Sequence, residues 1–535
     1  MAGKSGVRVV AAVALLLVAV APAGAQDGSG SGERPVVTAA VQVTPNPNPT
    51  RAHSSPQIAR NPVNGELVIA ETDVYGGFGI ATHISADGGR TWAPGGDPMM
   101  APYTWNSDYA INGPYVTAAF DDEGTLYMAF TAANPAQADL NRAERLRPVF
   151  LARSEDGGRT FRTTMAYQVT ASDPKTINNR RGRVALDPAN PQNVYVAWIQ
   201  SSAGEKARSM IIASTDGGAT FGRAVDLAES EAQGGYEPRP AVTPDGVVHA
   251  VYPGGGFAPQ APPGGPTPEP VIRPIFYRQS SDQGRTWSPP VVIDQGSAGF
   301  AHSRKQLLAA DPRTGNLYLT WYGNPSTRPG LDDDNDIYVR VSRDNGQTWG
   351  DRVTVNDEAR SGFVQHYDPG ISIAPNGRVD VAWYDFRNSP SPEVNLASAP
   401  FNYGGMTDVY YASSSDEGRT FGPNIRVSDR MADRSIGVWS NNVHSHYSVG
   451  IASANDGVYI AWQDSRNGNN ITNSEDVYFA SVLLDAPGVS VEDDSGVPGW
   501  VVAATGVAVG MGLAMLLAFL VSRRGTPEPA TARTH

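Results

Sequence analysis

Two short stretches of the chain place a tryptophan, an aspartate and an arginine at the same spacing. Residues 383–387 (WYDFR) and 462–466 (WQDSR) share the pattern W-x-D-x-R. A carboxylate beside a guanidinium could together bind a polar ligand. The same two groups could instead form a salt bridge that fixes the loop. The residues concerned are Asp385, Arg387, Asp464 and Arg466.

An acidic run over residues 332–336 (DDDND) offers carboxylate oxygens of the kind that bind Ca²⁺. It lacks the EF-hand spacing and the concluding glutamate, so a solvated acidic loop is the alternative. The histidines are not spaced as metal-ligand pairs, apart from His444 and His446, and the chain has no cysteine. The sequence therefore predicts no transition-metal site. The single cofactor that it suggests is Ca²⁺, at Asp332, Asp334 and Asp336.

These candidate residues lie within a unit that repeats along the chain. Six stretches fit the pattern S-x-D-x-G-x-T-[WF], roughly 60–70 residues apart, which is typical of one supersecondary unit repeated about an axis. The aspartate can accept hydrogen bonds from turn N–H groups, and the glycine adopts backbone angles that other residues resist. The pattern predicts a tight hairpin turn in each repeat. The six stretches begin at Ser85, Ser154, Ser214, Ser280, Ser342 and Ser414.

An alternating apolar strand occurs seven times, as in residues 193–198 (NVYVAW) and 457–462 (GVYIAW). With one strand before it, one leading into the repeated turn and one after the turn, each unit has four strands. The sequence therefore predicts an all-β fold over residues 35–485, a seven-bladed β-propeller of four-stranded blades. The last unit lacks a fourth strand, and we expect residues 36–43 to complete it and close the ring. Six blades with an appended hairpin are the alternative.

The six repeats resemble the Asp box, or BNR repeat, of the sialidase-type β-propellers. Repeats and flanking strands together cover roughly residues 36–484. The resemblance implies a propeller fold. Sialidase activity is one of several functions that it implies, because Asp-box propellers also serve as other glycosidases, sorting receptors and assembly factors.

Antiparallel geometry sorts the loops of such a propeller onto two faces. The links between strands one and two, and between strands three and four, share the face with the Asp boxes, which we name the box face. The links between strands two and three, and between blades, share the opposite face, which we name the loop face. Because the loop face carries most of the irregular sequence, we expect binding residues there, at the mouth of the central channel. The box aspartates are expected to be structural; they are Asp87, Asp156, Asp216, Asp282, Asp344 and Asp416.

The resemblance also implies a site chemistry. Sialidases hold the substrate carboxylate with three arginines and use a tyrosine nucleophile activated by a glutamate, with an aspartate as acid/base. Arg183, Arg239 and Arg304 come from matching positions of three consecutive units and could form such a clamp over a solvent-filled channel. The family's [FY]-R-I-P motif is absent, however, since residues 56–59 (PQIA) stand at that place, so the first arginine of the family has no match.

Two pairs of residues could supply the nucleophile and its helper. These are Tyr367 with Asp368, and Tyr236 with Glu237. Neighbours along a strand point to opposite sides, so working partners would have to come from different blades.

The two ends of the chain carry targeting signals. Residues 1–25 have basic residues, an apolar run and a small-x-small site, as in a secretory signal peptide. Residues 499–521 form a charge-free apolar run followed by two arginines, as in a membrane-spanning helix with residues 522–535 on the cytoplasmic side. A buried core helix is the alternative for that run. Residues 26–34 and 486–498 are expected to be flexible linkers.

The formal net charge of −13, without a basic stripe, argues against a nucleic-acid partner. Two function classes remain for this chain, expected at the cell membrane with its propeller outside the cytoplasm. One is a sialidase-like propeller that binds, or also hydrolyses, a glycan or glycoconjugate. The other is a non-catalytic scaffold that binds a surface protein. The sequence specifies neither the ligand nor the oligomeric state.

Overall fold

The structure is a computed structural model in which fourteen ranges of the chain are described. They are residues 35–44, 52–73, 79–103, 116–132, 147–168, 178–202, 205–231, 234–255, 274–295, 306–323, 335–359, 364–390, 405–437 and 449–484. In these ranges all regular elements are β-strands, and no helix there is long and apolar enough to span a membrane. The expected signal peptide, linkers, membrane-spanning helix and tail lie outside the described residues.

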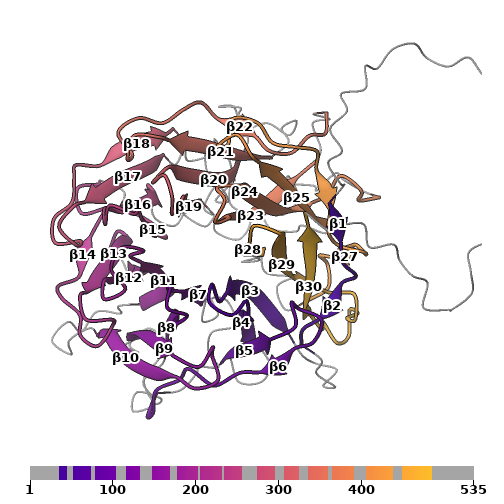
Figure 1. Cartoon of the computed structure of the whole chain (residues 1–535), viewed down its shortest axis with the longest axis horizontal. Helices are drawn as coiled ribbons and strands as arrows, with labels where there is room; N and C mark the ends of the chain where they lie inside the picture. Colours follow the sequence, from indigo (N-terminus) through magenta and orange to yellow (C-terminus); the bar gives the residue numbers. More distant parts are fainter. Residues whose placement is uncertain are drawn as a thin grey trace, which may run out of the picture.

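Seven antiparallel sheets surround one axis, and the first strand of each sheet lies nearest that axis (Figure 1). The first three blades are β3 (His53–Arg60), β4 (Leu67–Asp73), β5 (Gly79–Ser85) and β6 (Ala93–Pro94); β7 (Thr117–Phe120), β8 (Leu126–Thr131), β9 (Val149–Ser154) and β10 (Arg162–Tyr167); and β11 (Asn178–Leu186), β12 (Val194–Ser201), β13 (Arg208–Ser214) and β14 (Val225–Asp226).

The next three blades repeat the same order of strands. They are β15 (Arg239–Val242), β16 (Val248–Pro253), β17 (Ile275–Ser280) and β18 (Val291–Asp294); β19 (Leu307–Ala310), β20 (Leu317–Gly323), β21 (Asp336–Ser342) and β22 (Val353–Thr354); and β23 (His366–Ile373), β24 (Val379–Asp385), β25 (Met406–Ser414) and β26 (Ile425–Arg426), with β27 (Ala432–Asp433) also paired to β25.

The seventh blade combines the two ends of the propeller sequence. It contains β28 (Gly450–Ser453), β29 (Gly457–Asp464) and β30 (Asp476–Leu483), and its outer edge is formed by β1 (Val36–Val37) and β2 (Val41–Gln42). Both N-terminal strands pair antiparallel with β30, with Val36 opposite Leu483 and Val41 opposite Phe479. The predictions of seven blades and of an N-terminal closing strand are therefore confirmed.

The apolar core is divided among the contacts between neighbouring blades. Seven clusters of buried side chains occur in the described residues, one at each blade–blade interface. The second strands of four blades each contribute a fully buried tryptophan to these clusters, because the alternating apolar strands lie with both faces against neighbours. The tryptophans are Trp198, Trp321, Trp383 and Trp462.

All six Asp boxes have one hydrogen-bond pattern. In the third blade, Ser214 Oγ donates to Asp216 Oδ1 at 2.7 Å, and Thr220 donates its N–H to Oδ1 at 2.8 Å and its hydroxyl to Oδ2 at 2.6 Å. The same three bonds recur in the other five boxes. The carboxylate oxygens therefore accept hydrogen bonds within the turns between the third and fourth strands.

The box glycine is required for two reasons. Gly89 has φ +92°, and a Cβ there would lie 1.9 Å from the Phe479 ring of the neighbouring blade. Gly346 has φ +82°, and its Cβ would lie 1.8 Å from Tyr277 Oη. Each box thus forms a turn and at the same time lets two blades approach closely, which is the fold that the resemblance to sialidase-type propellers implies.

Candidate functional site

The inner strands of three blades carry the same irregularity near their loop-face ends. The pairing register of β3, β11 and β23 with the second strand shifts between Ser54 and Gln57, between Arg180 and Arg183, and between Tyr367 and Gly370. Such bulges re-aim side chains, and strained residues of this kind gather at functional sites. Each bulge contains one non-glycine residue with positive φ. These are Ser55 (54°), Arg181 (62°) and Asp368 (57°).

The bulge in β11 forms part of a cluster of three arginines around one carboxylate. Arg181 Nη1 donates to Glu237 Oε2 at 2.6 Å, and Arg239 Nη2 lies 2.7 Å from Glu237 Oε1. Arg183 Nη2 donates to the same Oε1. Glu237 precedes β15 in the fourth blade, so this single carboxylate joins the third and fourth blades. We name these four residues the arginine cluster.

The arginine cluster is buried, contrary to one expectation. The side chains of Arg181, Arg183 and Arg239 are 5–7% exposed and that of Glu237 is 1% exposed. The prediction that Arg183 and Arg239 project over a solvent-filled channel is therefore wrong. The physical reason is that Glu237 supplies the counter-charge that lets guanidinium groups leave water.

Burial and neighbouring charges shift the ionisation of the arginine cluster. Burial alone would raise the pKa of Glu237, but the three guanidinium groups outweigh it and hold that pKa well below its usual range. Burial, together with the charges of Arg183 and Arg181, lowers the pKa of Arg239 to about 9. A carboxylate with so low a pKa is a weak general base, because proton transfer is favoured when the pKa lies near the working pH.

The described residues leave the arginine cluster with a surplus of positive charge. Arg183 and Arg239 share one oxygen of Glu237 while Arg181 contacts the other, and in the described part of the chain Glu237 is the one carboxylate that contacts Arg183 and Arg239. In addition, the buried Nε–H groups of Arg183 and Arg239 have no hydrogen-bond partner among the described residues. Donors and charge of this kind favour a further anion at the site.

The structure brings together part of the predicted clamp. Arg183 and Arg239 meet at Glu237, whereas Arg304 lies outside the described residues. Arg181 also takes part, although the predicted clamp did not include it, because a regular strand would not give it the backbone turn that the bulge provides. Its guanidinium also lies 5.4 Å from the ring centroid of Tyr236, the neighbour of Glu237.

The other candidate tyrosine lies in a different environment. Tyr367 is buried in the apolar cluster between the fifth and sixth blades, and its hydroxyl donates to Gln365 Oε1 at 2.9 Å. Burial raises the pKa of Tyr367 well above its usual value, which disfavours the phenolate form. Asp368 is buried beside it in the bulge, and Arg434, which the sequence did not single out, stacks 5.3 Å from the Tyr384 ring centroid nearby.

Both W-x-D-x-R stretches form the same internal network. In the first, Asp385 Oδ2 accepts hydrogen bonds from Trp383 Nε1 at 2.9 Å and Arg387 Nη2 at 2.8 Å, and the backbone N–H of Arg387 donates to Oδ1. In the second, Asp464 contacts Trp462 and Arg466 in the same way. These contacts are those of a salt bridge that fixes the turn at the end of the second strand.

Two histidines occupy one equivalent position at the loop face. His53 begins β3 opposite Asp73, and His366 begins β23 opposite Asp385. His53 Nδ1 lies 2.9 Å from Oε1 of the fully buried Glu71. Burial by itself lowers the pKa of His53, but Glu71 outweighs it and raises that pKa to about 9. The imidazolium thus acts as an internal counter-ion for a carboxylate between the first and seventh blades.

Replacing His53 with glutamine should change how stability depends on pH. Because the folded-state pKa lies above the ordinary 6.5, the charged pair stabilises the fold fully below pH 6.5, and the contribution disappears as the pH rises through 9. The contribution is about 3 kcal/mol. Unfolding measured from pH 6 to 10 should therefore show a smaller loss of stability with rising pH in His53→Gln than in the wild type.

His249 provides the matched control for this measurement. Burial lowers its pKa to about 4, so it stays neutral over the whole range. Because histidine in the unfolded chain still takes up a proton near pH 6.5, His249→Gln should shift stability by the same amount at every pH above about 7.5. A pH slope in His53→Gln equal to that of the wild type would contradict the ion pair.

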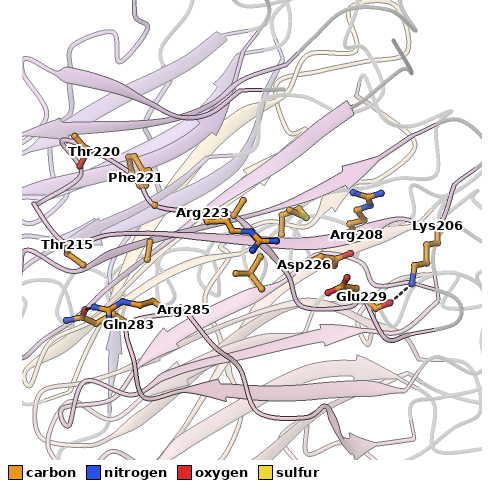
Figure 2. A pocket seen from close by; sticks show the side chains of 16 residues that line it. Lys206, Arg208, Thr215, Thr220, Phe221, Arg223, Asp226, Glu229, Gln283 and Arg285 are labelled. Carbon is orange, nitrogen blue, oxygen red and sulfur yellow. Dashed lines mark hydrogen bonds between the residues drawn. The ribbon is translucent and has the colours of Figure 1, made fainter. Parts of the chain in front are cut away.

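A separate groove lies on the outer flank of the third and fourth blades. It has a volume of about 880 Å³ and is lined by both basic and acidic side chains, including Arg208, Arg223 and Asp226 (Figure 2). Lys206 Nζ in this groove is already bonded to the carbonyl oxygens of Glu229 and Glu231. None of the predicted site residues lines it, so it is distinct from the arginine cluster.

Comparisons with known proteins give similarity to solved structures alone. No protein-family model and no curated protein matches the chain. An α-L-arabinanase of Penicillium chrysogenum complexed with arabinobiose aligns with a TM-score of 0.40 and 14% identity, over 65% of this chain and 94% of that one. The Hadza microbial sialidase Hz136 aligns with a TM-score of 0.41 and 14% identity, over 78% of this chain and 76% of that one.

A third similar structure is an ulvanlyase of polysaccharide lyase family PL25. It aligns with a TM-score of 0.45 and 10% identity, over 77% of this chain and 91% of that one. Similarity at this level does not assign a ligand. The functional argument therefore rests on the residues of this chain.

Proposed function

We propose that this protein binds an acidic glycan at its loop face, with a carboxylate of the ligand beside the arginine cluster. The observation that carries the proposal is the surplus of buried positive charge around Glu237. A ligand carboxylate would be attracted by this charge through the small part of each arginine side chain, 5–7%, that is exposed. In the same proposal, the targeting signals at the two chain ends place the propeller outside the cytoplasm on a single membrane-spanning helix.

Binding, rather than hydrolysis, is the activity that the geometry of the site favours. A sialidase-type reaction needs a glutamate that can take a proton from the nucleophilic tyrosine. Glu237 is held ionised by three arginines, and Tyr367 has its pKa raised by burial. Tyr236 is the remaining candidate nucleophile, and its neighbour on the chain is that same weakly basic Glu237.

A panel of acidic and neutral glycans, probed with the purified full-length protein, tests the proposal. We expect binding to glycans with a carboxylate and none to matched neutral glycans. Arg239→Lys keeps the charge but loses the planar set of donors, so it should weaken binding by about 1.5–3 kcal/mol, roughly 10- to 150-fold. Arg285→Lys, in the outer groove, is the matched control and should bind like the wild type.

Two outcomes would contradict the proposal. Equal binding of acidic and neutral glycans, or unchanged binding by Arg239→Lys, would remove the arginine cluster from the site. Capture of a surface protein without any glycan binding would favour the scaffold function instead. Turnover of fluorogenic sialosides that is lost in Tyr236→Phe would show that the site also hydrolyses its ligand.

A further inference from the structure

A cluster of acidic side chains with one histidine lies between the fifth and sixth blades, away from the arginine cluster. Asp336 begins β21 in the fifth blade, Glu358 follows β22, and His366 begins β23 in the sixth blade. One side-chain ligand atom from each of these three residues lies within 4.8 Å of the other two. Asp336 and His366 are buried, and the side chain of Glu358 is 19% exposed, which leaves a path to solvent.

The imidazole of His366 is oriented as in a metal ligand. Its Nδ1 lies 2.5 Å from the carbonyl oxygen of Asn335, and because a carbonyl can only accept, Nδ1 must carry the hydrogen. The other nitrogen, Nε2, points into the cluster, 2.9 Å from Glu358 Oε1, yet forms no directed hydrogen bond among the described residues. An imidazole whose Nδ1–H donates to a backbone carbonyl and whose Nε2 faces carboxylates is typical of metal sites.

Neighbouring groups hold the two carboxylates in place. Asn356 Nδ2 donates to Asp336 Oδ1 at 3.0 Å and to Glu358 Oε1 at 2.7 Å, and its own Oδ1 accepts from the backbone N–H of Ile337. Tyr338 donates to Asp336 Oδ2 at 3.0 Å. Each carboxylate oxygen has a second lone pair, so these bonds orient the oxygens and still allow coordination.

The carboxylates around His366 favour a positive charge at its Nε2, either a proton or a metal ion. The carboxylates of Asp336, Glu358 and Asp385 are opposed by the guanidinium of Arg387, which contacts Glu358 Oε2 at 2.6 Å and Asp385 Oδ2 at 2.8 Å. With a neutral imidazole, three negative groups against one positive group leave two negative charges. A divalent ion at Nε2 would neutralise them, and it would take the place of a proton on that nitrogen.

We propose that Asp336, Glu358 and His366 bind one divalent transition-metal ion, of the Zn²⁺ or Mn²⁺ type, across the interface of the fifth and sixth blades. An imidazole ligand favours these ions over Ca²⁺, which takes oxygen ligands. Of the acidic run that suggested Ca²⁺, Asp332 and Asp334 lie outside the described residues, and Asp336 is the residue that joins this site. Glu358 could not be predicted from the sequence, because its contact with His366 forms only when two blades meet.

The test uses untagged full-length protein, dialysed against a chelator and titrated calorimetrically with ZnCl₂, MnCl₂ and CaCl₂. We expect one Zn²⁺ or Mn²⁺ ion per chain, a rise in melting temperature on binding, and no saturable binding of Ca²⁺. Glu358→Gln removes one charged ligand without changing volume and should weaken binding at least tenfold. His366→Gln should abolish it.

Two measurements keep the result decisive. His53→Gln replaces the histidine at the equivalent position of the first blade and should leave metal binding unchanged. If His366→Gln does not fold, as judged by circular dichroism, Glu358→Gln decides the question. The proposed metal site would be overturned if neither Zn²⁺ nor Mn²⁺ bound one ion per chain, or if Glu358→Gln bound the metal with wild-type affinity.

Discussion

Replacing Glu237 with glutamine is expected to cost about 3–5 kcal/mol of folding stability, the range for removing one partner of a buried ion pair. The substitution keeps the volume of the side chain but leaves three guanidinium groups, each at most 7% exposed, without their shared carboxylate. The remaining like charges would repel across the interface of the third and fourth blades. Chemical unfolding of the full-length protein, followed by tryptophan fluorescence, measures the loss.

A surface glutamate gives the matched control for Glu237. Glu155, whose side chain is 71% exposed, pairs with Arg153 at 2.8 Å. Glu155→Gln should change stability by less than about 1 kcal/mol, because solvent screens such pairs. If Glu237→Gln were as stable as the wild type, the three arginines would not depend on this carboxylate. Other groups would then have to balance their charge, and the surplus of positive charge proposed as the anion site would be absent.

Deleting residues 35–44 should open the ring. Hydrogen bonds to β30 would be lost, among them four to its backbone. Thr38 N donates to Ser481 O at 2.9 Å, Val43 N donates to Val477 O at 2.8 Å, Val477 N donates to Thr44 Oγ at 3.0 Å and Ser481 N donates to Thr38 Oγ at 2.9 Å. Val43, which is 1% exposed between the seventh and first blades, would be lost as well. At about 1 kcal/mol for each of these four hydrogen bonds and about 2 kcal/mol for the valine, the deletion should cost at least about 6 kcal/mol. Thermal unfolding at several protein concentrations should also show aggregation, because β30 becomes an unpaired edge.

Deletion of residues 26–34 alone, with the leader kept, is the control. These residues precede the ring in sequence, so the melting temperature should stay that of the wild type. A synthetic peptide of residues 35–44 should restore much of the stability of the deleted chain by adding back the strand. A deleted chain that melts like the wild type would show that ring closure contributes little.

Features that depend on local sequence could be predicted. The box turns follow from Ser, Asp, Gly and Thr at fixed spacing, since the hydrogen bonds among these four residues join positions no more than four apart. The seven blades follow from the seven alternating strands. The closing strand was predictable because residues 36–43 alternate and the last unit lacked a partner.

The chemistry of the site depended on contacts that local sequence does not encode. Arg181 takes part through a bulge with positive φ at an arginine, for which composition gives no signal. Glu237 was expected to assist a tyrosine, yet it is bound by three arginines, two of them from the preceding blade. Glu358 meets Asp336 and His366 only because blades pack side by side.

The closing strand also determines the order in which the chain can fold. Each blade is a hairpin meander whose strands are near neighbours in sequence, whereas Thr38 and Ser481 meet across 443 positions. Bringing two points so far apart together costs about 5 kcal/mol of chain entropy before any contact forms, although stacked blades reduce that distance in space. Six blades can therefore assemble during synthesis, but the seventh must wait until Leu483 has emerged. Until that moment β1 and β2 have no partner strand, so folding of this protein requires that its first strands stay free of other partners until its last strand has been made.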